Sequence, residues 1–160
     1  MTEHTLRALL IAAAVGAGLI GGLFFIFSNT IMKAFDKLPA GGAIASMQRI
    51  NEVILNPVFF LAYFGTALIC VALLVVYISR LGQPGAVLAC SGALLYVLGS
   101  IVVTMVWNVP LNNKLAAIPA SAGDLVAQWQ AYRVPWTMWN HVRTIACLLA
   151  AAAFALSASA

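Results

Sequence analysis

Four long apolar runs alternate with polar segments along this chain. The runs cover residues 8–32, 53–78, 86–107 and 137–158. Each has about 22–26 residues, enough for a helix to cross a hydrocarbon core of about 30 Å at about 1.5 Å per residue. The interiors of the first three runs carry no charged residue. The pattern predicts four transmembrane helices.

The connections between the runs predict how these helices are arranged. Residues 79–85 form a short turn, so we expect the second and third helices to pair as an antiparallel hairpin. The segments 32–52 and 108–136 are longer and lie on the same side of the membrane. Within them, residues 40–51 and 122–132 have the spacing of short amphipathic helices. The predicted fold class is all-α: an integral membrane four-helix bundle with short amphipathic helices capping one end.

Composition supports a membrane protein and excludes other classes. Of the 160 residues, 64% are hydrophobic and 8% charged, whereas soluble domains are about 45–50% apolar and about 25% charged. We therefore predict one transmembrane domain over residues 1–160, a multi-pass protein surrounded by membrane lipid. The eight Lys and Arg residues are dispersed along the chain, which argues against nucleic acid as a partner.

Positive charges are distributed unevenly between the two ends of the predicted bundle. The uncapped end carries only Arg7 and Arg80. The capped end carries six cations: Lys33, Lys37, Arg49, Lys114, Arg133 and Arg143. Because positively charged loops tend to stay in the cytoplasm, we predict that the capped loops are cytoplasmic.

The first run contains a glycine-rich string. Residues 16–21 match G-x-G-x-x-G, but they lie inside an uncharged run of spanning length rather than between a strand and a helix, so nucleotide binding is not predicted. Ala14, Gly18 and Gly22 recur every four residues and predict a groove for close helix packing, within one subunit or between subunits. Four helices also leave much lipid-facing surface, so we predict a homo-oligomer.

The fourth run is the most informative because its uncharged part is short. Residues 144–158 span only about 22 Å, so the preceding helical turns must lie in or near the hydrocarbon edge. Polar groups at that depth are costly and indicate a functional site by default. On a helix, Trp136, Asn140 and Arg143 share one face. His141 points about 100° away from Asn140, toward a different neighbour.

Polar residues from the other runs gather at the same capped end. The third run ends with Asn108 and Asn112, where Pro110 predicts a kink or a stop, and Asn51 precedes the second run. Four aromatic residues would form the walls of a pocket there: Phe24, Phe25, Phe59 and Phe60. Apolar walls with a few polar groups suit a flat hydrophobic ligand. Helix-end packing, an aromatic belt and a snorkelling arginine would account for many of the same residues.

The residue inventory excludes several chemistries. No run carries a central Asp or Glu, as a proton-coupled exporter would need, and the chain has two histidines, too few for a three-histidine metal site in one subunit. Cys70, Cys90 and Cys147 lie in apolar runs and are expected to be buried, unreactive side chains. A single histidine, His141, can still act as a haem ligand, as a general base or as a metal ligand shared across subunits.

Three strings of the sequence resemble those of a known family. They are Met47-Gln48-Arg49-Ile50-Asn51, Asn108-Val109-Pro110-Leu111-Asn112 and Trp136-Thr137-Met138-Trp139-Asn140-His141-Val142-Arg143. They are similar, in order along the whole chain, to strings of a family of small four-span membrane proteins that includes the anthrone oxygenases of polyketide pathways. The resemblance implies an oxygenase-like protein of a bacterial cytoplasmic membrane, and it implies that positions 108, 112, 140, 141 and 143 are the ones to test.

These considerations assign roles to eight positions. The candidate catalytic residues are His141, Arg143 and Asn140. The candidate cofactor-binding residues are His141, Arg143 and Trp139, with His141 as the ligand of a haem iron. The candidate substrate-binding residues are Asn51, Asn108, Asn112 and Trp136.

Three functional hypotheses follow. In the first, His141 deprotonates an anthrone-, phenol- or quinone-like substrate, Arg143 and an asparagine amide stabilise the oxyanion, and O₂ reacts without a cofactor. In the second, His141 ligates a b-type haem and Arg143 pairs with a propionate. In the third, the chain is a non-enzymatic haem-, lipid- or quinone-binding membrane subunit, or a structural assembly partner.

Overall fold

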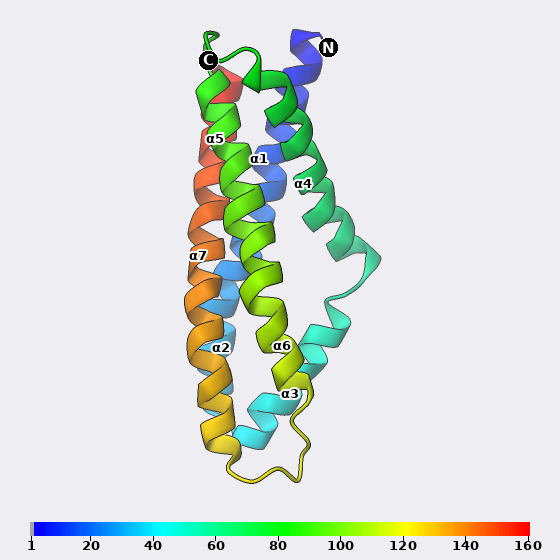
Figure 1. Ribbon diagram of the computed structural model, residues 1–160, viewed down its shortest axis with the longest axis vertical. Helices are drawn as coiled ribbons and strands as arrows, with labels where there is room; N and C mark the ends of the chain where they lie inside the picture. The colour runs from blue at the N-terminus through cyan, green and yellow to red at the C-terminus, as the bar shows by residue number, and fades with distance from the viewer. Residues whose placement is uncertain (1) are drawn as a thin grey trace.

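The structure, a computed structural model, describes residues 2–160, and every regular element within that range is helical (Figure 1). The α-helices are α1 (Glu3–Ile26), α2 (Met32–Phe35), α3 (Ala40–Val53), α4 (Pro57–Ile78), α5 (Ala86–Tyr96), α6 (Val109–Ala116) and α7 (Leu125–Ser159). Three π-helical segments continue them: η1 (Phe27–Ile31), η2 (Val97–Val102) and η3 (Thr104–Asn108). The predicted all-α class is confirmed.

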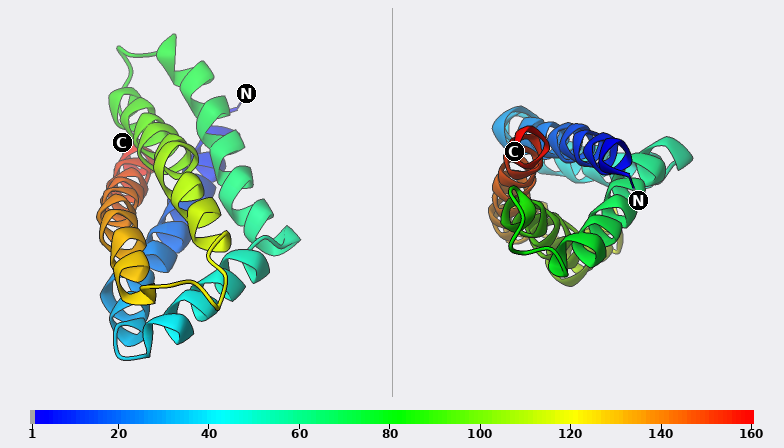
Figure 2. Two further views of the ribbon diagram at one scale, coloured as in Figure 1. Left: turned by 60° about the horizontal axis from the view of Figure 1, so that its bottom comes forward. Right: turned by 90° about the horizontal axis from the view of Figure 1, so that it is seen from above.

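Four continuous helical rods form the bundle. They cover Glu3–Phe35, Pro57–Ile78, Ala86–Ala116 and Leu125–Ser159, and each is long and apolar enough to cross a membrane, as predicted. Buried apolar side chains from α1, α4, α5 and α7 form the main core between the rods. Figure 1 shows α4 leaning away from the third rod toward its own N-terminal end, and Figure 2 shows the same separation after rotation.

The capped end has its own apolar core. Ile44 and Met47 of α3 are buried against α7 and against Leu115 of α6. The amide of Gln48 also donates hydrogen bonds to the carbonyls of Leu115 and Ile118, at 2.9 and 3.1 Å. The predicted amphipathic helix over residues 40–51 is therefore confirmed, and it closes this end of the bundle.

The second predicted cap helix is different in the structure. Residues 122–132 do not form a separate element, because α7 is one helix from Leu125 to Ser159 with Pro135 inside it. Proline removes one backbone hydrogen bond, but the face that carries Trp129, Tyr132 and Trp136 is buried continuously across that position. The shared apolar contact keeps the two segments in one helix.

Pro110 does not end the third rod either. It stands in the first turn of α6, directly after η3, and the helix continues to Ala116. A proline needs no amide partner, and the π-helical turns before it already shift the hydrogen-bond register. The third span is therefore longer than the predicted 86–107, and it carries Asn108 and Asn112 inside the bundle.

Backbone carbonyls in or beside the π-helical segments accept hydrogen bonds from side chains of other helices. A π turn holds one extra residue and interrupts the regular ladder, and such turns are frequent at functional sites. Beside η1, the Phe24 carbonyl accepts a hydrogen bond from Asn140 Nδ2 at 2.6 Å. In η2, the Ser100 carbonyl accepts one from the Tyr63 hydroxyl at 3.1 Å. Both irregularities lie beside the polar interior described below.

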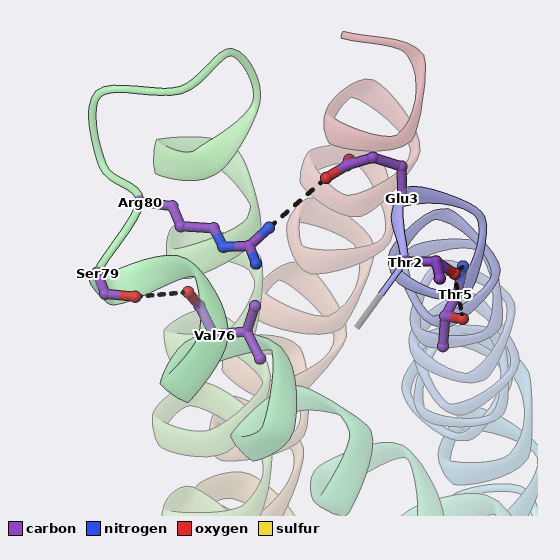
Figure 3. A network of polar contacts seen from close by, with 6 residues as sticks. All are labelled: Thr2, Glu3, Thr5, Val76, Ser79 and Arg80. Carbon is purple, nitrogen blue, oxygen red and sulfur yellow. Dashed lines mark hydrogen bonds and ion pairs between the residues drawn. The ribbon is translucent and has the colours of Figure 1, made fainter.

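The uncapped end holds the short turn between α4 and α5 and both ends of the described chain (Figures 1 and 3). Arg80 of the turn reaches Glu3 of α1 at 3.7 Å, and the Ser79 hydroxyl donates to the Val76 carbonyl at 3.1 Å. Gly85 adopts a φ of 73° just before α5, a conformation that favours glycine. The predicted antiparallel hairpin of the second and third helices is confirmed.

Close helix packing occurs at glycines other than the predicted groove. A Cβ on Gly22 would have no neighbour within 4 Å, and one on Gly18 would be 3.9 Å from Ala151, an ordinary contact. A Cβ on Gly16 would meet the Thr66 hydroxyl instead, and one on Gly99 would meet the Cβ of Ala146. The two tightest approaches are thus between α1 and α4 and between η2 and α7.

Gly99→Ala is expected to destabilise the bundle by about 1–3 kcal/mol, because the new methyl overlaps a neighbouring Cβ that cannot rotate away. Gly22→Ala is the matched control: it adds the same methyl to open space and is expected to be neutral or stabilising. Thermal unfolding of the two variants in detergent tests this. Equal melting temperatures would contradict the packing described for Gly99.

Candidate functional site

A narrow cavity of about 100 Å³ lies inside the capped end of the bundle, between α1, α3, α4, the third rod and α7. Its lining is mostly apolar and aromatic, with four polar residues: Asn51, Thr104, Asn112 and Arg143. A wider cavity of about 330 Å³ lies next to it and is lined by residues of α3, α6 and the α3–α4 link, including Glu52. The two cavities share five lining residues: Asn51, Ile54, Leu55, Val109 and Asn112.

Arg143 is the one charged residue in the lining of the inner cavity. Only 5% of its surface is exposed, and its guanidinium lies over the ring of Phe24 at 4.1 Å and near that of Trp136 at 5.3 Å. The three ion pairs within residues 2–160 join other charges, so Arg143 has no carboxylate partner there. Its Nε is buried without a hydrogen-bond acceptor. A buried cation in this state is costly unless it serves a ligand.

Asn140 holds the guanidinium and joins it to the first rod. Its Oδ1 accepts from Arg143 Nη2 at 2.6 Å, and its Nδ2 donates to the Phe24 carbonyl and to the Ser28 hydroxyl, both at 2.6 Å. The amide orientation is unambiguous because a guanidinium only donates and a carbonyl only accepts. Asn140 does not line the cavity, so it holds the Arg143 guanidinium in position from outside the cavity.

Asn112 presents a hydrogen-bond donor at the junction of the two cavities. Its Oδ1 accepts from the indole of Trp136 at 2.8 Å and from the hydroxyl of Tyr132 at 3.0 Å. The indole can only donate, so Nδ2 is the amide atom left for another partner. Nearby, Asn51 Nδ2 is buried without an acceptor. Together with Arg143 Nε, the lining offers unused donors, which suits a ligand rich in acceptor oxygens.

The structure adds two residues that the sequence analysis did not single out. Thr104 Oγ1 receives a hydrogen bond from Arg143 Nη1 at 3.1 Å and another from the Tyr63 hydroxyl at 2.7 Å. Thr104 precedes Asn108 by four residues and so shares its helix face, a spacing that could have pointed to it. Tyr63 lies inside an apolar run with no such signal.

Besides Asn140, three of the predicted residues lie outside the cavity. Asn108 is buried and donates to the Trp136 carbonyl at 3.2 Å, which ties the third rod to α7. Trp139 stacks on Trp107, with ring centroids 4.0 Å apart. His141 is exposed on another face of α7 and lines a separate cavity between α1 and α7. The structure therefore brings Asn51, Asn112, Trp136, Asn140 and Arg143 together, and it does not bring His141 to Arg143.

The surroundings of His141 do not fit a haem. The cavity beside it lies on the outside of the bundle and measures about 240 Å³, which is too small to enclose a haem. Arg143, which would pair with a propionate, lines the other cavity. Within residues 2–160 no group of three or more His, Cys, Asp and Glu side chains is placed to hold a metal ion.

The three cysteines lie in the interior and are free thiols, as expected from the sequence. Neither cavity at the capped end includes one of them in its lining. They contribute to helix packing rather than to the candidate site.

Comparison with known proteins identifies a family for this chain. No curated protein and no solved structure matched the chain. The family model described as anthrone oxygenase matches residues 59–153, more than half of the chain. The match covers the third rod and most of α7, and with them Thr104, Asn112, Trp136, Asn140 and Arg143. This chain belongs to the anthrone oxygenase family.

Proposed function

We propose that this protein is an oxygenase that converts the activated methylene of a flat, anthrone-like phenol to a ketone at the expense of O₂. The observation that carries the proposal is Arg143: a buried cation without a carboxylate partner, held by Asn140 and Thr104 at the wall of an aromatic cavity. Family membership supports an oxygenase-like activity.

Arg143 suits the first chemical step, the loss of a proton from the substrate. Removing a proton from a methylene between two aryl rings and conjugated to a carbonyl places negative charge on the carbonyl oxygen. A preorganised cation and amide donors in a site shielded from water stabilise that oxyanion far better than water does. Arg143 Nε and the amides of Asn51 and Asn112 are the available donors.

No carboxylate or histidine lines the inner cavity, so the proton leaves into the wider, more polar cavity, to the carboxylate of Glu52 or to water. The carbanion then donates its electrons to O₂ and forms a carbon–oxygen bond. Protonation of the peroxide and loss of water yield the ketone. The balance is one anthrone plus one O₂ giving one anthraquinone and one water, and it needs no external reductant.

The shape of the two cavities fits an elongated ring system. The inner cavity of about 100 Å³ is too small for a fused tricycle, but it accepts one edge that carries the oxygen. The remaining rings occupy the adjoining cavity of about 330 Å³. Phe24, Phe59 and Trp136 supply the aromatic walls. This arrangement gives an acceptor oxygen access to Arg143 while the rings stay against apolar side chains.

The test is O₂ uptake by the purified protein in lipid nanodiscs with 1,8-dihydroxyanthrone as substrate. We expect saturable turnover above the autoxidation rate, with one O₂ consumed for each anthraquinone formed. An absorption spectrum and metal analysis of the same preparation show whether a haem or metal accompanies the activity. Saturable binding of the anthrone or the corresponding quinone with no turnover would replace the proposal with a non-enzymatic quinone-binding protein.

A further inference from the structure

A second polar cavity lies on the outside of the bundle, between the first rod and α7. It measures about 240 Å³ and shares no lining residue with the inner cavity of the candidate site. It is lined by Phe25, Ser28, Asn29, Met32, Lys33, Arg133, Thr137 and His141. We call it the α1–α7 groove.

The groove has a polarity gradient along the membrane normal. The first rod and α7 run in opposite directions (Figure 1). Phe25, Asn29 and Lys33 follow one another at four-residue spacing on the first rod. His141, Thr137 and Arg133 do the same on α7 in the reverse order. The groove is thus cationic at the capped end and neutral but polar in the middle. Phe25 and His141 line the end farthest from the cap.

The cationic end retains free donors. Among the residues that the structure describes, Lys33 forms one hydrogen bond, from Nζ to Asn29 Oδ1 at the long distance of 3.5 Å, so two of its three N–H groups are available. Arg133 is more committed: it pairs with Asp36 at 3.1 Å and donates to Gln130 Oε1. Within residues 2–160, Asp36 is the acid that pairs with this end. Lys33 is therefore the main free cation of the groove.

The middle of the groove contains a further polar group without a hydrogen-bond partner, in addition to the free donors of Lys33. The Thr137 hydroxyl is buried and has no hydrogen-bond partner within the described residues. A buried hydroxyl of this kind costs free energy unless something occupies the groove and pairs with it. The Asn29 amide lies across from it on the first rod.

We propose that the α1–α7 groove binds one anionic phospholipid. Its phosphate is held by Lys33 at the membrane surface, and its ester oxygens accept from Thr137 and Asn29. Its acyl chain runs past Phe25 and His141 toward the bilayer centre. Basic pockets between transmembrane helices are typical sites for anionic head groups, and the order of charged, polar and aromatic residues along the groove matches the order of groups in such a lipid. This inference is independent of the proposed oxygenase activity.

Lipid retention tests the groove. The protein is reconstituted in nanodiscs of equal phosphatidylglycerol and phosphatidylcholine, transferred to mild detergent and analysed for bound lipid by native mass spectrometry. The wild-type protein is expected to retain phosphatidylglycerol preferentially. Lys33→Gln should reduce that preference by about five-fold, the effect of one cation near an anionic surface, and Thr137→Val should shorten the retention of the lipid.

Lys37→Gln is the matched control, because Lys37 lies at the same end, is exposed and does not line the groove. It should leave the preference unchanged. An equal loss in Lys33→Gln and Lys37→Gln would mean general surface attraction and overturn the proposal. Displacement of the lipid by millimolar inorganic phosphate would overturn it in favour of a free-phosphate site. No preference in the wild-type protein would also overturn it.

Discussion

Replacing Arg143 with methionine is expected to abolish anthrone oxidation and to leave the bundle folded. Methionine is similar in length and apolar, so it fills the space beside Phe24 and Trp136 without the charge. The oxyanion then loses its cationic donor, and the loss of one such donor typically costs about 10²–10³-fold in kcat. We expect the loss to reach at least this range, because Arg143 is the one cation lining the inner cavity.

Arg143→Met should have little effect on stability. This result would distinguish a residue needed for activity from one needed only for helix packing. A buried cation without a carboxylate contributes little net stability, since its desolvation opposes its contacts. The melting temperature of Arg143→Met is therefore expected to equal or exceed that of the wild-type protein, although the Asn140 oxygen loses a donor. Turnover and thermal unfolding, measured on the same nanodisc preparation, test both halves.

Two further variants sharpen this test. Arg143→Lys keeps the charge but loses the planar fork that is shared between Asn140 and Thr104, and we expect it to recover only a small part of the activity. Arg80→Met removes an arginine from the opposite end and should leave turnover unchanged. If Arg143→Met retains wild-type turnover while the bundle unfolds more easily, then Arg143 is structural and the proposed mechanism is wrong.

The fold was predictable from the apolar runs because a hydrocarbon core constrains length and composition strongly. Four spans, the short hairpin turn and the cap helix over residues 40–51 all appear in the structure. The continuity of α7 through Pro135 was not predictable, since it depends on Trp129, Tyr132 and Trp136 being buried together against other elements. Local helix signals carry no information about that tertiary contact.

Part of the candidate site was also predictable from the sequence. The shared helix face of Trp136, Asn140 and Arg143 follows from helical spacing alone, and the structure brings these residues together. The angle of about 100° between His141 and Asn140 indicated that the histidine faces another neighbour. It could not tell whether that neighbour was the inner cavity of the candidate site or the α1–α7 groove. Tyr63 and Thr104 were missed because π-helical turns in the third rod decide which carbonyls and hydroxyls meet.

The largest loss of stability is expected from Asn140→Leu. Asn140 is fully buried and makes three hydrogen bonds of 2.6 Å that join α7 to the first rod and to Arg143. Leucine leaves the Ser28 hydroxyl and one side of the guanidinium without a partner, and the Phe24 carbonyl keeps only the backbone amide of Phe27. Each buried group left unpaired costs about 1–3 kcal/mol, and a charged group costs more. The melting temperature should fall by roughly 6–12 °C for a loss of about 3 kcal/mol.

Asn108→Leu is the matched control for this effect. Asn108 is equally buried, but it makes one hydrogen bond, to the Trp136 carbonyl, and its Oδ1 has no partner. Leucine at this position removes an unsatisfied oxygen together with the bond, so its cost should be less than half that of Asn140→Leu. Similar melting temperatures for the two variants would show that the three Asn140 hydrogen bonds contribute no more to stability than the single one of Asn108.

Combining Asn140→Leu with Arg143→Met tests whether the two residues act as one unit. In the single Asn140→Leu variant, most of the cost comes from a cation that has lost its acceptor in a buried site. Removing that cation as well should recover part of the lost stability, so the double variant should be more stable than Asn140→Leu alone. A double-mutant cycle on thermal unfolding should give a coupling of about 0.5–3 kcal/mol. Additive effects of the two substitutions on stability would instead mean that Asn140 serves helix packing alone. Positioning a costly cation for a substrate requires the two side chains to be energetically coupled.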